Sequence, residues 1–185
     1  MLRTIPALAV AASILLVPIP SAAVAQATTA AKIASAMTAA PESVARNATI
    51  IDWPDSTGRI VTLRQGTNGW TCLPSQPKSQ YITNNAMCAD QNFNDMLTAL
   101  LAGKPPVLKG VGYSYMLSNE TWESNTDFAS TKPTADNQWH HVGSHVMIVY
   151  PDKSALAGLP TQPSTTGPYV MWASTPYAHV MWPVK

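Results

Sequence analysis

One segment of this chain, residues 90–102, has the spacing of an amphipathic helix. Asp90 suits the N-cap of that helix, Gly103 suits its end, and Pro105 with Pro106 prevents its continuation. The apolar positions recur three and four residues apart, at Phe93, Met96, Leu97, Leu100 and Leu101. We therefore expect one main amphipathic helix, which has to bury its apolar stripe against other elements of the fold.

The N-terminal half before this helix is divided into short runs that resemble β-strands. Residues 48–53 and 59–65 are rich in β-branched side chains and flank a turn at 54–58. A second turn at 66–69 leads into residues 70–73. Strand, tight turn and strand is the pattern of a β-hairpin, so this part of the chain is predicted to be a meander.

The half after the helix contains four more strand-like runs. They span 109–117, 145–150, 169–173 and 179–184, and the last two are predicted to pair as a closing hairpin. Residues 118–139 between the first two form a long polar segment that we expect to be a loop. The fold class predicted from these patterns is α+β, with a predominantly antiparallel β-sheet on which the amphipathic helix packs.

Cys72 and Cys88 are the two cysteines of the chain. In an exported protein such a pair forms a structural disulfide, and closing a loop of this length adds about 3 kcal/mol of stability in chain-entropy models. Because Cys88 precedes the helix and Cys72 ends the meander, the bridge is expected to staple the helix to the hairpin sheet.

The first 27 residues have the order of a secretory signal peptide. Arg3 precedes an apolar run that ends in small residues, and we place cleavage after Ala27. The run is short and is interrupted by prolines, which argues against a membrane span. We therefore predict an exported protein, periplasmic or extracellular, with an Ala-rich segment at 28–46 that is partly helical or flexible. Residues 47–185 are predicted to form a single α+β domain.

The charge of the exported chain restricts its partners. Loss of Arg3 with the leader leaves ten of the eleven basic residues against ten acidic ones, and no basic run remains. Such a surface lacks the basic patch that binds nucleic acid and the cluster of cations that binds anionic lipid. The expected partner is a small molecule or another protein, and the oligomeric state is left open.

Several blocks of the chain are similar to the recurring blocks of a known family. These are GTNGWTCLP, MCADQNF, KGVGYSYML, SNTD, SHVMIVYPD and GPYVMWASTPYAHVM, which together cover most of the chain from about Ala48 onward. They resemble a functionally uncharacterised family of small exported proteobacterial proteins. The resemblance implies an exported single-domain protein, and it brings no catalytic or binding residues with it.

The tripeptide His-Val-Met occurs twice and suggests a metal site. On strands, His145 would share a face with Met147, and His179 would share a face with Met181. If the two strands pair antiparallel, we expect His145 opposite Met181 and Met147 opposite His179, within about 5.5 Å at Cβ. Two imidazoles and two thioethers suit a soft ion such as Cu(I), so copper is the one cofactor that the sequence suggests.

This ligand set is similar to that of periplasmic copper-binding proteins, which combine Met, His and a nearby Trp. Trp172 and Trp182 each follow a methionine directly, so in regular strands they are expected to face away from it. The alternative is that the methionines simply fill an irregular core.

A small exported enzyme is the second interpretation. His145 or His179 would act as general base, oriented by a carboxylate from the polar segment. Ser144 is a conceivable nucleophile, although no Gly-x-Ser-x-Gly motif surrounds it. The candidate carboxylates are Asp127, Glu123 and Asp136.

Aromatic side chains are concentrated in the C-terminal half and suggest a third interpretation. Aromatic walls with a few polar groups form pockets for small apolar or sugar-like ligands, and otherwise they form core. The side chains are Tyr113, Tyr115, Trp122, Trp139, Trp172, Tyr177 and Trp182. Taken together, the patterns favour an exported binding or accessory protein, with any site expected where residues 118–141 meet the two His-Val-Met strands.

Overall fold

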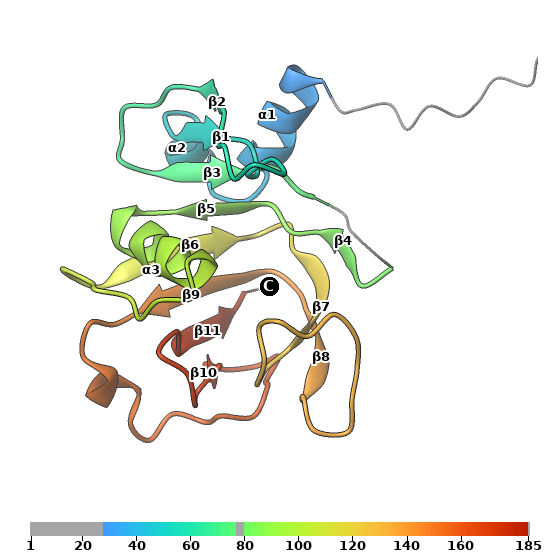
Figure 1. The fold of residues 1–185 in the computed structure, drawn as a ribbon, viewed down its shortest axis with the longest axis vertical. Coiled ribbons are helices and arrows are strands. Elements are labelled where there is room, and N and C mark those ends of the chain that lie inside the picture. The colour runs from blue at the N-terminus through green and yellow to red at the C-terminus, as the bar shows by residue number, and fades with distance from the viewer. Residues whose placement is uncertain (1–27, 77–79, 185) are drawn as a thin grey trace, which may run out of the picture.

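The computed structural model describes residues 28–76 and 80–184 (Figure 1). The segment interpreted as a signal peptide, residues 1–27, lies outside the described residues. Among the helices that are described, none has the length and the hydropathy needed to cross a bilayer.

A mixed sheet of eight strands runs through the molecule, and Figure 1 shows its strands stacked from β2 at one end to β10 at the other. The strand order is β10-β11-β9-β6-β5-β3-β1-β2. In chain order the strands are β1 (Thr49–Ile51), β2 (Thr62–Arg64), β3 (Thr71–Leu73), β5 (Met87–Ala89), β6 (Gly112–Met116), β9 (His145–Val149), β10 (Tyr169–Met171) and β11 (His179–Pro183).

The expected antiparallel arrangement holds for most of this sheet but not for all of it. β1 pairs antiparallel with β2 as predicted, but it also pairs parallel with β3. β1 therefore lies between the other two strands, and the predicted meander of three consecutive neighbours is wrong. The predicted closing hairpin is confirmed, because β10 and β11 pair antiparallel.

A second sheet of three strands contains β4 (Ile82–Asn84), β7 (Glu120–Ser124) and β8 (Trp139–Val142). Only residues 117–119 separate β6 from β7, and only residues 143–144 separate β8 from β9. Because β6 pairs with β9 and β7 pairs with β8, the four strands form one bent antiparallel ribbon that passes from the large sheet into the small one. The expectation of a continuous loop over 118–139 is therefore wrong, and the loop proper spans 125–138.

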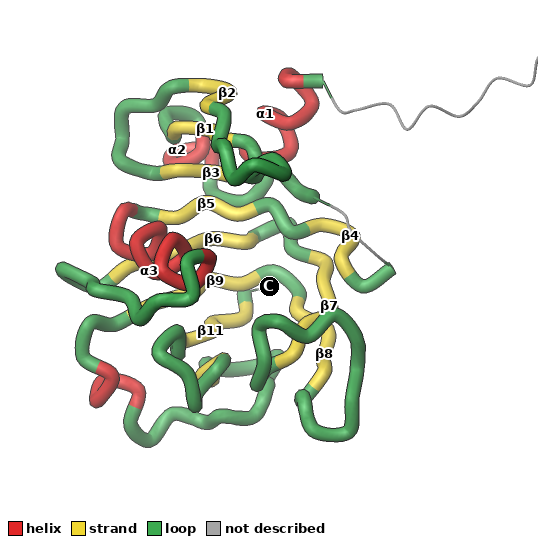
Figure 2. Tube along the Cα trace, in the orientation of Figure 1, coloured by secondary structure: helices red, strands yellow, loops and turns green. Residues whose placement is uncertain are grey.

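The predicted amphipathic helix is confirmed as α3 (Gln91–Leu101), one of the helices that Figure 2 shows in red. The Asp90 side chain accepts a hydrogen bond from the Phe93 amide at 2.9 Å, which caps the first turn as expected. α3 packs on β5, β6 and β9, where a Cβ atom added to Gly112 would come within 2.5 Å of the Phe93 nitrogen. The helix lies this close to the sheet because Gly112 has no side chain.

The N-terminal helices, α1 (Thr29–Met37) and α2 (Glu42–Ala45), pack on the opposite face at one end of the sheet, where α1 contacts β2, β3 and β5. A short 3₁₀ helix, η1 (Lys153–Leu156), lies outside the sheet. The predicted Cys72–Cys88 disulfide is present, with 4.0 Å between the Cα atoms. It joins the neighbouring strands β3 and β5 and lies in the core beneath α1, so the expectation that it staples α3 to the sheet is wrong.

Candidate functional site

The two His-Val-Met strands are neighbours, as predicted, but their register differs from the expected one. β9 and β11 pair antiparallel with Met147 opposite Met181, which leaves His145 opposite Pro183. The predicted pairing of His145 with Met181 is therefore wrong by two residues. Because the side-chain period of a strand is two, a shift of two keeps both histidines on the predicted face.

Each imidazole lies opposite a methionine, though not the one that was expected. Met116 of β6 is opposite His145, and Met171 of β10 is opposite His179. The predicted partner of His179, Met147, pairs with Met181 and with β6 instead. Two His–Met pairs thus flank a Met–Met pair on one face of the sheet.

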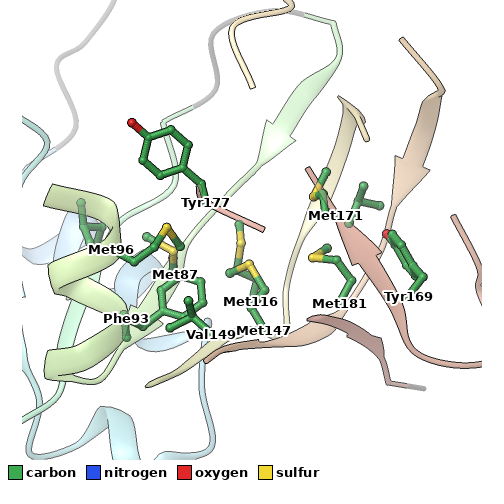
Figure 3. Packing of buried hydrophobic residues seen from close by; sticks show 13 residues of the cluster. Met87, Phe93, Met96, Met116, Met147, Val149, Tyr169, Met171, Tyr177 and Met181 are labelled. Carbon is green, nitrogen blue, oxygen red and sulfur yellow. The ribbon is translucent and has the colours of Figure 1, made fainter. Parts of the chain in front are cut away.

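A cavity of about 190 Å³ lies between this face and α3, and both histidines line it. Six of the eight methionines of the chain line the same cavity. Figure 3 shows their side chains extending from several strands and from α3 into one region. The six are Met87, Met96, Met116, Met147, Met171 and Met181.

His179 is held in one tautomer by the backbone. Its Nδ1 donates a hydrogen bond to the Tyr177 carbonyl at 2.9 Å, which places the lone pair on Nε2. Nε2 is buried and has no hydrogen-bond partner among the described residues. Burial lowers the pKa of His179 to about 4, and the positive charges of His145 and Lys153 act in the same direction. The ring is therefore neutral at physiological pH, and the lone pair on its buried Nε2 is available to a metal ion.

His145 repeats the same local arrangement. Its Nδ1 donates to the Gly143 carbonyl at 2.7 Å, again two residues earlier in the chain, and the side chain is 3% exposed. Burial lowers the pKa of His145 to about 4, although the hydrogen bond to Gly143 opposes the shift. Both histidines present Nε2 in the form that binds a metal ion.

Trp172 lies on the histidine side of the sheet, so the expectation that it faces away is wrong. Its φ angle of 51° places it in the left-handed region, which turns the side chain back toward the core at the end of β10. The indole Nε1 donates to the Ser124 carbonyl at 3.0 Å, and the ring lies 5.0 Å from the His179 ring at 77°. Trp182 does face outward, with half of its surface exposed.

Glu123 of β7 reaches the same cavity from the small sheet. Burial raises the pKa of its carboxyl group, and the hydrogen bond from the Thr121 hydroxyl at 3.1 Å only partly opposes this. No described salt bridge involves Glu123. A partly buried carboxyl group without a cation is a feature that a positively charged ligand would stabilise.

The described hydrogen bonds do not join the candidate catalytic residues Asp127 and Ser144 to either buried histidine. The Asp127 carboxylate accepts hydrogen bonds from the Ala129 amide and the Ser130 hydroxyl, and no described hydrogen bond joins it to a histidine. The Ser144 hydroxyl donates to the Leu117 carbonyl at 2.5 Å. Because both Nδ1 atoms of the buried histidines bond to backbone carbonyls, neither ring has the carboxylate partner of a catalytic triad.

The other two histidines lie on β8 and serve different contacts. His140 bonds the Gln138 carbonyl through Nδ1, so that its Nε2 accepts a hydrogen bond from the Tyr169 hydroxyl at 3.0 Å. His141 is exposed and bonds Glu120 at 2.9 Å. Across the described residues, no three His, Cys, Asp or Glu side chains are grouped in a way that would hold a metal ion.

The described arrangement can therefore offer a soft ion nitrogen and sulfur donors. His179, Met171 and Met181 occupy adjacent positions on β10 and β11 and are each about 1% exposed. Sequence reasoning named His179 and Met181 but did not name Met171 and Met116, which lie opposite the two histidines. The third Val-Met, in YVM, was the available signal for Met171, because it repeats the pattern of the two His-Val-Met strands.

Comparisons of this chain with protein-family models, with curated proteins and with solved structures found no match.

Proposed function

We propose that this chain is an exported protein that binds a soft monovalent metal ion, Cu(I), in the methionine-lined cavity. The observation that carries the proposal is the Nε2 atom of His179, which is buried beside Met171 and Met181 and has no hydrogen-bond partner in the described part of the chain. A buried polar atom without a hydrogen bond costs about 1–3 kcal/mol, so the fold tolerates a defect that a metal ion would repair.

The donor set favours Cu(I) over harder ions. Thioether sulfur is a soft ligand that suits Cu(I), whereas Ca²⁺ and Mg²⁺ take oxygen ligands. The hydrogen bond from Nδ1 to the Tyr177 carbonyl is the outer contact that usually orients a metal-binding imidazole. Trp172, in contact with the His179 ring, would shield the ion from water.

Entry of the ion requires a side chain to move, because His179 Nε2 is fully covered. Methionine is suited to this movement, since it has three rotatable bonds and adapts to irregular spaces. The Glu123 carboxyl group lines the same cavity and would balance the single positive charge of the ion. The proposal therefore assigns Glu123 to charge balance and His179, Met171 and Met181 to coordination.

The disulfide supports the proposed export. Disulfides persist in oxidising compartments such as the periplasm and the extracellular space, and they are rare in the cytosol. The Cys72–Cys88 bridge consumes both thiols of the chain, so no thiolate competes with the thioethers for the ion.

Titration of the purified protein with Ag(I), a redox-stable substitute for Cu(I), tests the proposal. We expect binding tighter than micromolar, measured against a chromophoric chelator, and no comparable binding of Zn(II). Because the pKa of His179 is about 4, protonation of the imidazole should not weaken binding between about pH 5.5 and 7.5. An exposed histidine site would instead lose affinity below its pKa of about 6.5.

Two leucine variants separate coordination from packing. Met171→Leu conserves volume but removes a sulfur, and it should weaken Ag(I) binding by at least about tenfold. Met37→Leu is the matched control, because Met37 packs on the opposite face of the sheet. With methyl-labelled methionine, the signals of Met171 and Met181 should shift on Ag(I) addition while that of Met37 stays in place. Binding no tighter than micromolar, or equal loss in both variants, would refute the proposed site.

A further inference from the structure

A second cavity lies on the other side of Glu123 and Trp172, which line both spaces. It is a cleft of about 410 Å³ formed mainly by the small sheet and by the loop 125–138. Aromatic rings form much of its wall, and two of them, those of Trp122 and Phe128, are nearly half exposed. The lining rings are Tyr81, Trp122, Phe128, Trp139 and Trp172.

The rings meet edge to face rather than stacking in parallel. Phe128 meets Trp172 with 5.9 Å between centroids and an interplanar angle of 64°. Tyr81 meets Trp139 at 5.3 Å and 81°. Rings that meet at steep angles direct their π faces along different axes, which is how aromatic walls surround a rounded group.

The cleft carries negative charge at Asp127. No lysine, arginine or histidine is among its described lining residues. Hydrogen bonds from the Ala129 amide and the Ser130 hydroxyl lower the pKa of Asp127, so this carboxylate is ionised at neutral pH. Both the π faces and this carboxylate attract a positive charge.

The two serine hydroxyl groups of the cleft are already bonded within the protein. The Ser124 hydroxyl donates to the Asn137 carbonyl at 2.8 Å, and the Ser130 hydroxyl donates to Asp127 at 2.8 Å. A sugar needs several uncommitted donors and acceptors, whereas a cation without N–H groups needs only π faces and negative charge. The aromatic faces and the ionised Asp127 carboxylate therefore favour an organic cation over the sugar-like ligand considered from the sequence.

We propose that this cleft binds a small quaternary ammonium compound of the choline type. The trimethylammonium group is round, apolar at its surface and positively charged, which matches perpendicular aromatic walls beside a carboxylate. The site is independent of the metal proposal, because it needs no nitrogen or sulfur donor.

The sharpest test compares choline with its neutral isostere, 3,3-dimethylbutan-1-ol, on the unaltered protein. The two molecules have the same shape and differ in charge, so any difference in affinity reports recognition of the cation. By calorimetry or NMR titration we expect choline to bind at least about tenfold more tightly. Equal affinities, tighter binding of a methyl glucoside, or no binding of choline at millimolar concentration would each overturn the proposal.

Variants locate the binding to the cleft. Asp127→Asn and Trp122→Ala change exposed side chains, and each should weaken choline binding by about tenfold. Asp152→Asn is the matched control for the first, because Asp152 makes the same turn contacts with Ser154 away from the cleft. Trp182→Ala is the control for the second. Equal losses in variants and controls would place the binding elsewhere and refute the cleft.

Discussion

The two faces of the large sheet carry different kinds of side chain. The face under α1 is packed with small side chains, chiefly alanines, around the Cys72–Cys88 bridge. The face under α3 is packed with methionines and aromatic rings around a cavity that holds two neutral imidazoles. Small side chains and a covalent bond give a closed scaffold, whereas long flexible side chains leave space and polar atoms that a ligand can use. Under the proposed function, one face of the sheet serves stability and the other serves binding.

Lowering the pH should destabilise the α3 face, and we expect the largest loss of unfolding free energy from this change. Both buried histidines have a folded-state pKa of about 4, below the unfolded value of about 6.5. Between these values the unfolded chain binds more protons, so stability is complete above about pH 6.5 and is lost as the pH falls toward 4. We expect roughly 3 kcal/mol per histidine, measured as the free energy of unfolding in urea across this window.

The slope of stability against pH, rather than its absolute value, identifies the groups responsible. His179→Asn keeps a donor for the Tyr177 carbonyl and removes the titrating ring, so it should flatten the slope by about half. His141→Asn, at an exposed histidine, is the matched control. A slope that is the same in all three proteins would show that the buried rings do not govern acid sensitivity.

Removal of the disulfide should act on the α1 face and spare the cavity. The double variant Cys72→Ala with Cys88→Ala opens a loop with a sequence separation of 16 and should lose about 3 kcal/mol of unfolding free energy. Ag(I) affinity should stay within about twofold of the unaltered protein, because the bridge faces α1 rather than the cavity. Loss of Ag(I) binding together with stability would show that the two faces are coupled.

Local patterns predicted the faces of this fold better than its pairings. Alternation along β9 and β11 placed His145 and His179 on one face, and helical spacing with the Asp90 cap located α3. The register of β9 against β11 depends on the path of the chain between them, which no local pattern records, so the opposing methionines were missed. The orientation of Trp172 depends on a single positive φ angle at a non-glycine residue, which regular alternation does not anticipate.

The polar segment 118–139 shows the same limit. β7 carries polar and charged residues on both faces, so its alternation does not distinguish a strand from a loop. It becomes a strand because β6 continues into it and β8 pairs with it. Glu123 therefore reaches the cavity through an element that the sequence alone did not predict.

The close approach of α3 to the sheet provides the next test of the α3 face. Gly112→Ala adds a Cβ atom within 2.5 Å of the Phe93 nitrogen, and it should cost about 2 kcal/mol of unfolding free energy by displacing the helix. Gly167→Ala is the matched control, because no atom lies within 4 Å of the added Cβ, and it should change stability by less than about 0.5 kcal/mol. Equal effects would mean that α3 is not held against Gly112.

The smallest effect concerns how each face tolerates a change of side chain. Met181→Leu on the α3 face conserves volume beside a cavity, so it should cost less than about 1.5 kcal/mol. Ala36→Val on the α1 face adds two methyl groups to a side chain with no exposed surface. It should cost about 1–3 kcal/mol of unfolding free energy, although alanine is a smaller residue than methionine. Urea unfolding of both variants measures the difference. If Met181→Leu proves the more damaging change, the thioether is a packing element that leucine cannot replace, and the view of the α3 face as an adaptable binding surface fails. If the expected order is found and Met181→Leu also loses Ag(I), the sulfur is retained for the ion rather than for the fold.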